Sequence, residues 1–273
     1  MVRLLPFSIA EAHQLRPQQT VEEMLFTGFY PRIYDHGLDP AQALGDYFET
    51  YVERDVRLLS EIRNLTLFQR FVRLCAGRAG QLLNLHGLGS DAGVSHTTAR
   101  HWLSVLEASY VVFLLPPYFA NVSKRLVKSP KIYFYDVGLA AHLLGIEHPR
   151  QVLTHPLRGA LFENLVVIEA LKHRYTTGRR SNLLFYRDSS QLEVDLLYPV
   201  ADSLIAVEAK AGETVSGQFF AGFDKLRKVL GTRVRGEILV HGSEERYERG
   251  SSHVTGPSGF VPVLAALEEE LRA

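Results

Sequence analysis

The stretch LEVDLLYPVADSLIAVEAK, residues 192–210, decides how the C-terminal part of this chain folds. Two apolar runs, 192–198 and 204–210, flank a short loop of four residues, 200–203, and this arrangement predicts a β-hairpin. Side chains alternate between the two faces of a strand. Alternation places four apolar side chains on one face of the first strand: Leu192, Val194, Leu196 and Tyr198.

The other face of the predicted hairpin carries charged side chains. In the register that the short loop favours, Asp195 lies opposite Glu208 and Glu193 lies opposite Lys210. Directly opposed residues have Cβ atoms ~5 Å apart, and like charges at that spacing are destabilising. Two carboxylates on a mostly apolar hairpin therefore need a partner. Mg²⁺ is an economical one, because it binds one or two carboxylates together with waters and phosphate oxygens.

Lys210 lies two residues beyond Glu208 and projects from the same face of the strand. There it could stabilise developing negative charge or orient an attacking water. An Asp followed by Glu-Ala-Lys on the next strand is the spacing of a metal-dependent phosphodiesterase core. The alternative is a solvated hairpin face on which Glu193 and Lys210 form an ordinary cross-strand ion pair.

A third acidic residue, Glu163, lies in GALFENLVVIEALKH, residues 159–173. We expect a helix over 157–174 that is apolar almost all round, and an acidic side chain in such a helix is costly unless it meets a partner. Packing of this helix on the sheet could bring Glu163 to the two hairpin carboxylates. The alternative is that Glu163 pairs with Arg158 or Arg187.

Residues 82–110, LLNLHGLGSDAGVSHTTARHWLSVLEASY, predict a helix-turn-helix. The first helix is expected to end at Gly93, and Ser95 can cap the second helix. In this motif the N-terminal residues of the second helix reach DNA base edges. Those residues are His96, Thr97, Thr98, Arg100 and His101.

The segment that follows is basic. No acidic residue lies between Glu107 and Asp136, and four basic residues do: Lys124, Arg125, Lys128 and Lys131. A β-hairpin carrying them would be the wing of a winged helix, and the wing would neutralise phosphates. We therefore expect DNA as a partner. The alternative is a protein-protein module, because winged helices also serve that role.

The length and composition of the chain limit the classes of protein to which it can belong. The 273 residues are 46% hydrophobic and 22% charged, with 30 Lys and Arg balanced by 30 Asp and Glu. These values suit a globular chain of one or two domains. No apolar run approaches the ~18 residues of a membrane span, so we expect no membrane partner. No secretory signal is evident, and the single cysteine, Cys75, permits no internal disulfide. We therefore expect a cytoplasmic protein. Balanced net charge argues against wholesale polyanion binding but leaves local patches open.

We expect an α/β protein (α+β overall) in successive parts. Residues 1–45 are mixed and rich in turn signals, and a long helical stretch, 46–78, follows with Asp46 as its cap. The part up to residue 150 is mainly helical, and residues 151–273 are α/β. The expected strands there are 183–187, 192–198, 204–210 and 237–241, with a helix at about 216–229, then a loop rich in Gly, Ser and Pro and a short helix at the end.

The order of the acidic residues resembles that of the PD-(D/E)xK nuclease superfamily, with Glu163, Asp195, Glu208 and Lys210 at the motif positions. More specifically, the chain resembles the C-terminal region of a prokaryotic AAA-type ATPase family whose C-terminal domain is of unknown function. The matching stretches include FTGFYPRIYD (26–35), YFETYVERDV (47–56), the block 97–145, GALFENLVVIEAL (159–171) and VEAKAG (207–212).

The resemblance implies three parts: a remnant of the end of the ATPase core (1–45), a helical winged-helix domain (46–150), and a restriction-endonuclease-like α/β domain (151–273). The chain departs from such ATPases because it has no GxxxxGK[ST] motif, so ATP is not expected as a cofactor.

Two functions follow as hypotheses. In the first, a Mg²⁺-dependent nuclease-like domain accompanies a DNA-binding winged helix. Asp195 and Glu208 would hold the metal with a backbone carbonyl near Ala209, Lys210 would assist the water, and Glu163 would complete or orient the site. In the second, the chain is a non-catalytic DNA- or protein-binding module that keeps the nuclease fold as a scaffold, with a protein partner or a second copy of itself.

Overall fold

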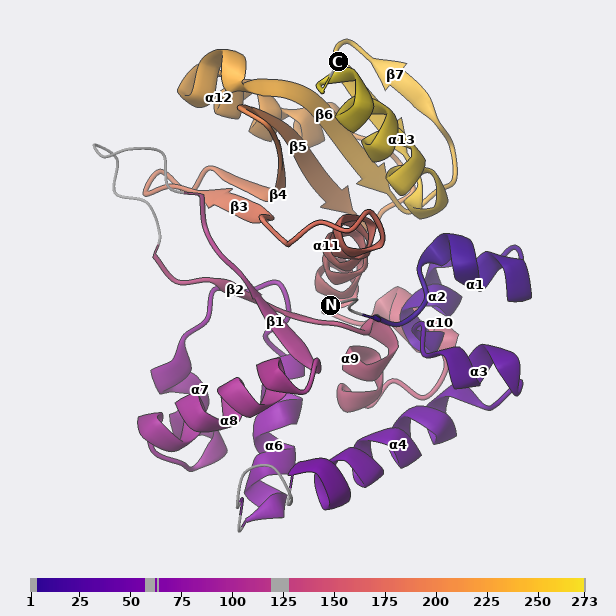
Figure 1. Ribbon diagram of the computed structural model, residues 1–273, viewed down its shortest axis with the longest axis vertical. Coiled ribbons are helices and arrows are strands. Elements are labelled where there is room, and N and C mark those ends of the chain that lie inside the picture. The colour runs from indigo at the N-terminus through magenta and orange to yellow at the C-terminus, as the bar shows by residue number, and fades with distance from the viewer. Residues whose placement is uncertain (1–3, 57–61, 63, 119–127, 273) are drawn as a thin grey trace. The chain divides into compact units, whose positions relative to one another are not determined.

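The structure is a computed structural model, and it describes residues 4–56, 62, 64–118 and 128–272 (Figure 1). The chain forms two compact units. We call Leu5–Leu114 with Pro130–Leu165 the helical unit, and Met1–Leu4, Leu115–Ser129 and Val166–Ala273 the sheet unit. Helices combine with a mixed sheet, so the expected α/β class is confirmed. No helix among the described residues is long and apolar enough to cross a membrane.

The helical unit begins with four helices, of which two start with a capping box. Ser8 caps the first together with Glu11, and Thr20 caps the second together with Glu23. The four helices are α1 (Ile9–Leu15), α2 (Val21–Thr27), α3 (Pro31–Asp35) and α4 (Pro40–Thr50).

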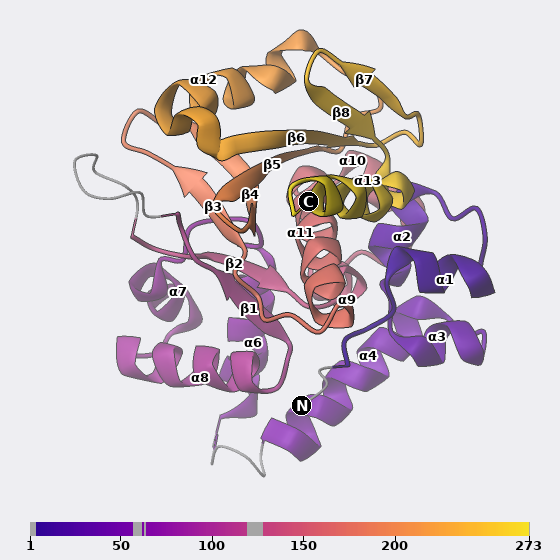
Figure 2. The same ribbon diagram turned by 45° about the horizontal axis from the view of Figure 1, so that its top comes forward.

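A close backbone contact joins α2 to α9 (Val137–Leu143). The Asp136 carboxylate caps α9 by accepting from the Leu139 N–H at 2.9 Å, and it also accepts from the Phe29 N–H at 2.7 Å. A Cβ atom at residue 138 would lie only 2.4 Å from the backbone nitrogen of Gly28. Glycine at position 138 is what lets the end of α2 reach the start of α9. Helix α10 (Pro149–Thr154) also packs on α2, and both views show them side by side (Figures 1 and 2).

The expected helix over 46–78 is interrupted, and its expected cap is wrong. Helix α4 starts at Pro40 with Asp39 as its cap, because a proline at the first helical position has its backbone preset for a helix start. A π-helical turn, η1 (Tyr51–Val56), follows α4 directly. A separate helix, α6 (Leu65–Ala76), then begins with its own cap, Asn64.

The expected helix-turn-helix is present as a local structure. Helix α7 (Leu85–Ala92) ends at Gly93, whose φ is +80°, and α8 (His96–Ala108) is capped by Ser95, as expected. Trp102 of α8 lies edge-on to two phenylalanine rings of α6, with centroids 5.4 and 5.5 Å away. This packing fixes which face of α8 is buried. Two short strands, β1 (Val112–Leu115) and β2 (Lys131–Phe134), form a sheet beside these helices.

The sheet unit contains a six-stranded sheet in the order β3-β4-β5-β6-β8-β7. Strands β5, β6 and β8 run parallel, and the remaining pairs are antiparallel. The four expected strands are confirmed. Strand β8 lies within the stretch expected to be a loop, and β7 lies in a segment with no predicted element. The strands are β3 (Leu184–Arg187), β4 (Glu193–Val200), β5 (Ser203–Lys210), β6 (Val234–His241), β7 (Tyr247–Arg249) and β8 (Ser252–Thr255).

The β4–β5 hairpin adopts the expected register. Leu196 pairs with Val207, and the pairing continues to Val200 and Ser203. Because Val200 and Ser203 are themselves paired, the turn contains two residues rather than four. Its first residue, Ala201, has a φ of +48°.

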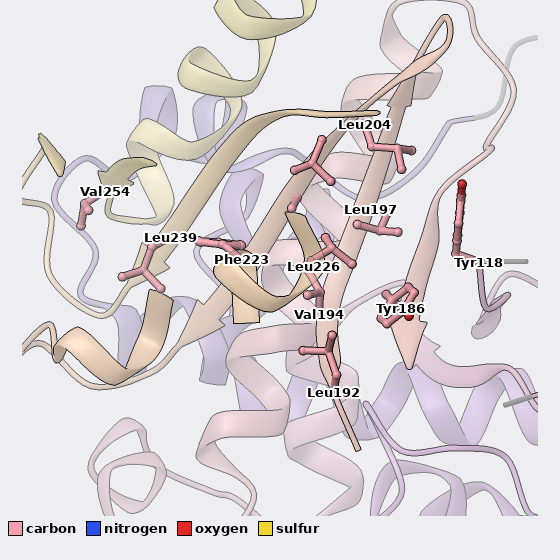
Figure 3. Close-up of a cluster of buried hydrophobic side chains, with 12 residues drawn as sticks. Tyr118, Tyr186, Leu192, Val194, Leu197, Leu204, Phe223, Leu226, Leu239 and Val254 are labelled. Atoms are coloured by element: carbon pink, nitrogen blue, oxygen red, sulfur yellow. The ribbon is translucent and has the colours of Figure 1, made fainter. Parts of the chain in front are cut away.

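Helices cover both faces of the sheet (Figure 2). Helix α12 (Ala221–Leu230), with a 3₁₀ turn at each end, lies on one face over the apolar cluster drawn in Figure 3. Helix α13 (Pro257–Glu270) lies on the other face. Its Leu267 packs closely on Gly236 of β6, where an added Cβ atom would lie 3.3 Å from the Leu267 Cδ1. Helix α11 (Arg158–Thr176) contributes its C-terminal half to the sheet unit.

A β-bulge interrupts the pairing of β3 with β4. Leu184 pairs with Leu197, but Tyr186 pairs with Val194, so β4 carries one extra residue between these points. Val194 and Leu197 consequently enter the same apolar cluster (Figure 3). The expectation of strict alternation from Leu192 to Tyr198 is therefore wrong. Bulges re-aim side chains and are common next to active sites.

The contact between Gly28 and Gly138 yields a stability prediction. Gly138→Ala should lower the free energy of unfolding by about 3 kcal/mol, because the new methyl group meets backbone atoms that cannot rotate away. Urea unfolding followed by circular dichroism measures this change. The matched control is Gly159→Ala in α11, which has open space around it and should gain up to ~1 kcal/mol. Equal stability of Gly138→Ala and wild type would contradict the prediction.

Candidate functional site

Three of the four proposed catalytic side chains meet at the end of the β4–β5 hairpin. The Lys210 Nζ lies 2.6 Å from the Glu208 Oε2 and 3.5 Å from the Asp195 Oδ2. The Ala209 N–H donates to the same Asp195 oxygen at 2.9 Å. Asp195 and Leu196 are the two β4 residues that lie opposite a single β3 residue, Phe185, in the bulge, and the Asp195 carboxylate is directed toward β5. The lysine and the two carboxylates thus form one charged cluster.

This cluster is largely withdrawn from water. Glu208 is 5% exposed and Asp195 is 9% exposed, whereas the Lys210 side chain retains 32% of its surface. Helix α12 covers Glu208 closely: a Cβ atom at residue 222 would lie 2.9 Å from the Glu208 Oε1. Gly222 is therefore the residue that makes room for the carboxylate. Lys210 is the most exposed member of the cluster, and the Asp195 side chain keeps 13% of its surface exposed.

Burial raises the pKa of Glu208 well above its ordinary value, and the negative charge of Asp195 raises it further. The ammonium of Lys210 opposes this shift but does not cancel it. Two carboxylates this close cannot both ionise easily, so the folded protein holds the Glu208 proton to higher pH than the unfolded chain does. The hydrogen bond between the two carboxyl groups stabilises that protonated state.

The fourth residue, Glu163, lies in the helical unit and contacts other side chains there. Its Oε1 accepts from the Lys131 Nζ at 2.8 Å and from the Tyr133 hydroxyl at 2.5 Å. Gly80, with a φ of +72°, lies beside the same carboxylate. Both donors come from β2, whose tertiary position the sequence pattern did not reveal.

The two arginines considered as alternative partners of Glu163 form other ion pairs. Arg158 pairs with Glu22 at 2.8 Å, and Arg187 pairs with Glu193 at 3.0 Å across β3 and β4. Lys210 pairs with Asp195 and Glu208, and not with Glu193 as in the alternative of a cross-strand ion pair. The hairpin end is thus a buried cluster and not a solvated face.

The donor chemistry of Asp195 and Glu208 suits a hard cation. Mg²⁺ binds through one or two carboxylates and keeps several waters, so this pair with the backbone carbonyl nearby meets its needs. Within the described parts of the chain, no three His, Cys, Asp or Glu side chains gather in an arrangement that could hold a metal ion. A metal here would therefore depend on two protein carboxylates.

The proposed DNA-binding residues have different surroundings. On α8, His96, Thr97 and Arg100 are exposed, as a recognition surface requires. Thr98 is half-buried, and its hydroxyl lies 2.9 Å from that of the capping Ser95. The exposed surface at the start of α8 is therefore formed by His96, Thr97 and Arg100, and Thr98 contributes less to it.

The basic residues of the expected wing divide into three groups. Lys124 and Arg125 lie outside the described residues, and Lys128 is exposed. Lys131 is 1% exposed and ion-paired with Glu163, so it does not face solvent and cannot reach a phosphate there. Its assignment to the DNA surface is corrected for this reason: as a residue of β2 it points into the unit.

Gly222 and the bulge in β4 were not anticipated as parts of the site. A glycine within the amphipathic pattern of 216–229 was a usable signal, because glycine in a helix often marks a close approach. The bulge has no such signal, since it depends on how β3 pairs.

Both halves of the chain match domains of unknown function. Residues 18–150 match the Domain of unknown function (DUF8612), and residues 158–259 match the Domain of unknown function (DUF4143). The second match contains Asp195, Glu208 and Lys210. It confirms the C-terminal domain of unknown function that the resemblance implies.

Two curated proteins are similar to this chain. They are the uncharacterized protein Rv2008c of Mycobacterium tuberculosis and the uncharacterized protein Mb2031c of Mycobacterium bovis, each 32% identical over 233 residues. The alignment covers 85% of this chain and 51% of each relative, so the chain spans about half the length of these proteins. No solved structure matches the chain.

The raised pKa of Glu208 gives a pH-dependent prediction. The unfolded chain loses the Glu208 proton near pH 4.5, but the folded protein holds it to higher pH. Wild type should therefore lose stability relative to Glu208→Gln as pH rises from 4.5 to the folded pKa, with a slope of at most ~1.4 kcal/mol per pH unit. Urea unfolding of both proteins across this range measures the difference.

Glu193→Gln is the control for this measurement, because it removes a half-exposed carboxylate from the same strand. Its difference from wild type should not show the same decline. A Glu208→Gln difference that stays constant with pH would mean that Glu208 ionises normally in the folded protein.

Proposed function

We propose that this protein binds DNA and that its sheet unit hydrolyses phosphodiester bonds with Mg²⁺. The observation that carries the proposal is the convergence of Asp195, Glu208 and Lys210 at the β4–β5 hairpin. Carboxylates on adjacent strands with a lysine beside them are the groups that this chemistry requires. The exposed part of Lys210 is where a substrate phosphate would approach the cluster.

Asp195 and Glu208 would hold the metal, which, when bound, would polarise a phosphoryl oxygen and activate water. The Ala209 N–H keeps one Asp195 oxygen in place. Lys210 is the most exposed member of the cluster, and its ammonium can stabilise negative charge on the phosphate or orient the attacking water. Glu163 stays a proposed contributor, and its bonds to Lys131 and Tyr133 fix the orientation of its carboxylate.

DNA binding is assigned to the exposed side of α8. His96, Thr97 and Arg100 lie on the first turns of the second helix of a helix-turn-helix, the position from which base edges are read. Lys128 supplies a further exposed cation after β1. Phosphate contacts from such cations would contribute affinity without sequence preference.

A second candidate function is a non-catalytic DNA- or protein-binding module that retains the sheet unit as a scaffold. The observation that favours it is the 2.6 Å bond from the Lys210 Nζ to the Glu208 Oε2. That bond gives Glu208 a partner within the protein, and the hydrogen bond between the Glu208 and Asp195 carboxyl groups gives it a second one. Such a network is stable without a cation, as a structural ion-pair cluster would be.

Nicking of supercoiled plasmid DNA separates the two candidates. With Mg²⁺ or Mn²⁺, wild type should nick the plasmid, and Asp195→Asn and Lys210→Met should each reduce the rate by about 100-fold, because each removes a charge at the reacting phosphate. Glu193→Gln is the matched control on the same strand and should keep the wild-type rate.

Equal nicking by wild type, Asp195→Asn and Lys210→Met would identify a contaminating nuclease and contradict the catalytic proposal. Absence of metal-dependent nicking in a wild-type preparation that still binds DNA would favour the non-catalytic module.

The role of α8 can be measured separately. Arg100→Gln should weaken duplex DNA binding and reduce the slope of log affinity against log salt by about 1, because one positive charge at the DNA surface is lost. Fluorescence anisotropy with a labelled duplex at several salt concentrations gives this slope. Arg235→Gln, at an exposed position of β6, is the charge-matched control. The same loss in both variants would show that the contact is not specific to α8.

A further inference from the structure

A second buried carboxylate cluster lies on the other face of the sheet from Asp195 and Glu208. Its centre is Glu268 of α13, which is buried and lies beside Tyr198 of β4. Tyr198 and Leu197 are neighbours on β4 and point to opposite faces, and Leu197 belongs to the cluster under α12. Five side chains direct donors at Glu268: His173, Arg174, Arg179, Tyr198 and Arg272.

One oxygen of Glu268 has more donors than it can accept. Its Oε1 is within hydrogen-bond distance of the Arg174 Nη1 at 3.2 Å, the Arg272 Nη2 at 2.9 Å, and the Arg179 Nη1. A carboxylate oxygen has two lone pairs directed at donors. Three guanidinium groups therefore share an acceptor that satisfies two, and the other oxygen is already taken by Tyr198 and His173.

The cluster also carries more positive than negative charge. Three guanidinium groups surround one carboxylate, and the charges of Arg179 and Arg272 lower the pKa of Arg174, which burial lowers most. Among the described residues, the exposed Glu269 and Glu270 form no ion pair with these arginines. Like charges this close repel one another, so an added anion would stabilise the cluster.

The three arginines differ in what holds them. Arg174 is buried, lies over the Tyr198 ring with its Cζ 3.6 Å from the centroid, and donates to the Pro199 carbonyl. Arg179 and Arg272 have 32% and 43% of their side chains exposed, and each makes one bond to Glu268. Each of these two guanidinium groups keeps further N–H donors for a ligand at the surface.

We propose that Arg179 and Arg272 form a binding site for a phosphate group, with Glu268 holding both guanidinium groups in position. Planar guanidinium groups bind phosphate through paired hydrogen bonds, which makes arginine well suited to this ligand. The phosphate can come from a nucleic-acid backbone or from a small phosphate compound. The site is separate from the Asp195 cluster and does not depend on catalysis there.

The test uses inorganic pyrophosphate as the probe, at constant ionic strength maintained with sodium chloride. Pyrophosphate should raise the melting temperature of wild type, and calorimetric titration should show affinity reduced about tenfold by Arg179→Gln or Arg272→Gln. Both variants should fold, because Arg174, His173 and Tyr198 still surround Glu268. Arg180→Gln is the matched control, since Arg180 is exposed next to Arg179 and should keep wild-type affinity.

A labelled DNA duplex, measured by anisotropy with the same variants, distinguishes the two sources of phosphate. Loss of duplex affinity in Arg179→Gln and Arg272→Gln, beyond that of Arg180→Gln, supports the site and assigns it to a nucleic-acid backbone. Pyrophosphate binding that depends on these arginines without a change in duplex affinity supports the site and assigns it to a small ligand. Equal effects of all three substitutions, or no binding of either probe at this site, would overturn the proposal.

Discussion

Burial of a carboxylate is tolerated only where donors or a proton replace the water it has lost, and this constraint shapes both units. Asp136 meets it with two backbone N–H groups and thereby connects the N-terminal helices to α9. Glu163 meets it with Lys131 and Tyr133, which connect α11 to β2. In each case the acid links segments that are far apart in the sequence, so its partner helps to define the tertiary fold.

The two carboxylate clusters of the sheet unit meet the same constraint in opposite ways. Around Glu268 donors are abundant, and its pKa is lowered by bonds from Tyr198 and its other partners in spite of burial. Around Glu208 donors are few, so burial raises its pKa, the adjacent Asp195 carboxylate raises it further, and the proton is held to higher pH than in the unfolded chain. The first cluster has an excess of positive charge, whereas the second carries a net negative charge only when both of its carboxylates are ionised. We propose a phosphate as the ligand of the first cluster and a cation as the ligand of the second.

Features that depend on residues close together in the sequence could be predicted. The spacing of the β4 and β5 runs fixed their register, and with it the meeting of Asp195, Glu208 and Lys210. Ser95 was recognisable as a cap because capping involves residues three apart. Asp46 was mistaken for a cap because a stronger start, Asp39 followed by a proline, lay about two helical turns upstream.

Features that depend on distant segments were beyond sequence reasoning. The bulge in β4 exists only through its pairing with β3, and the partners of Glu163 lie on a strand about thirty residues away. Burial of Lys131 could not be read from a basic stretch, since the pattern does not say which lysine faces the interior.

The glycine contact between α2 and α9 has a consequence for how this protein can be divided. Gly28 and Gly138 touch through their backbones, and the Asp136 carboxylate bonds to Phe29. Shortening the chain to begin at residue 46 would uncover the backbone of α9 and leave a buried acid with one of its donors missing. The N-terminal helices are thus a covering that the later helices need, and an expression fragment of the helical unit has to include them.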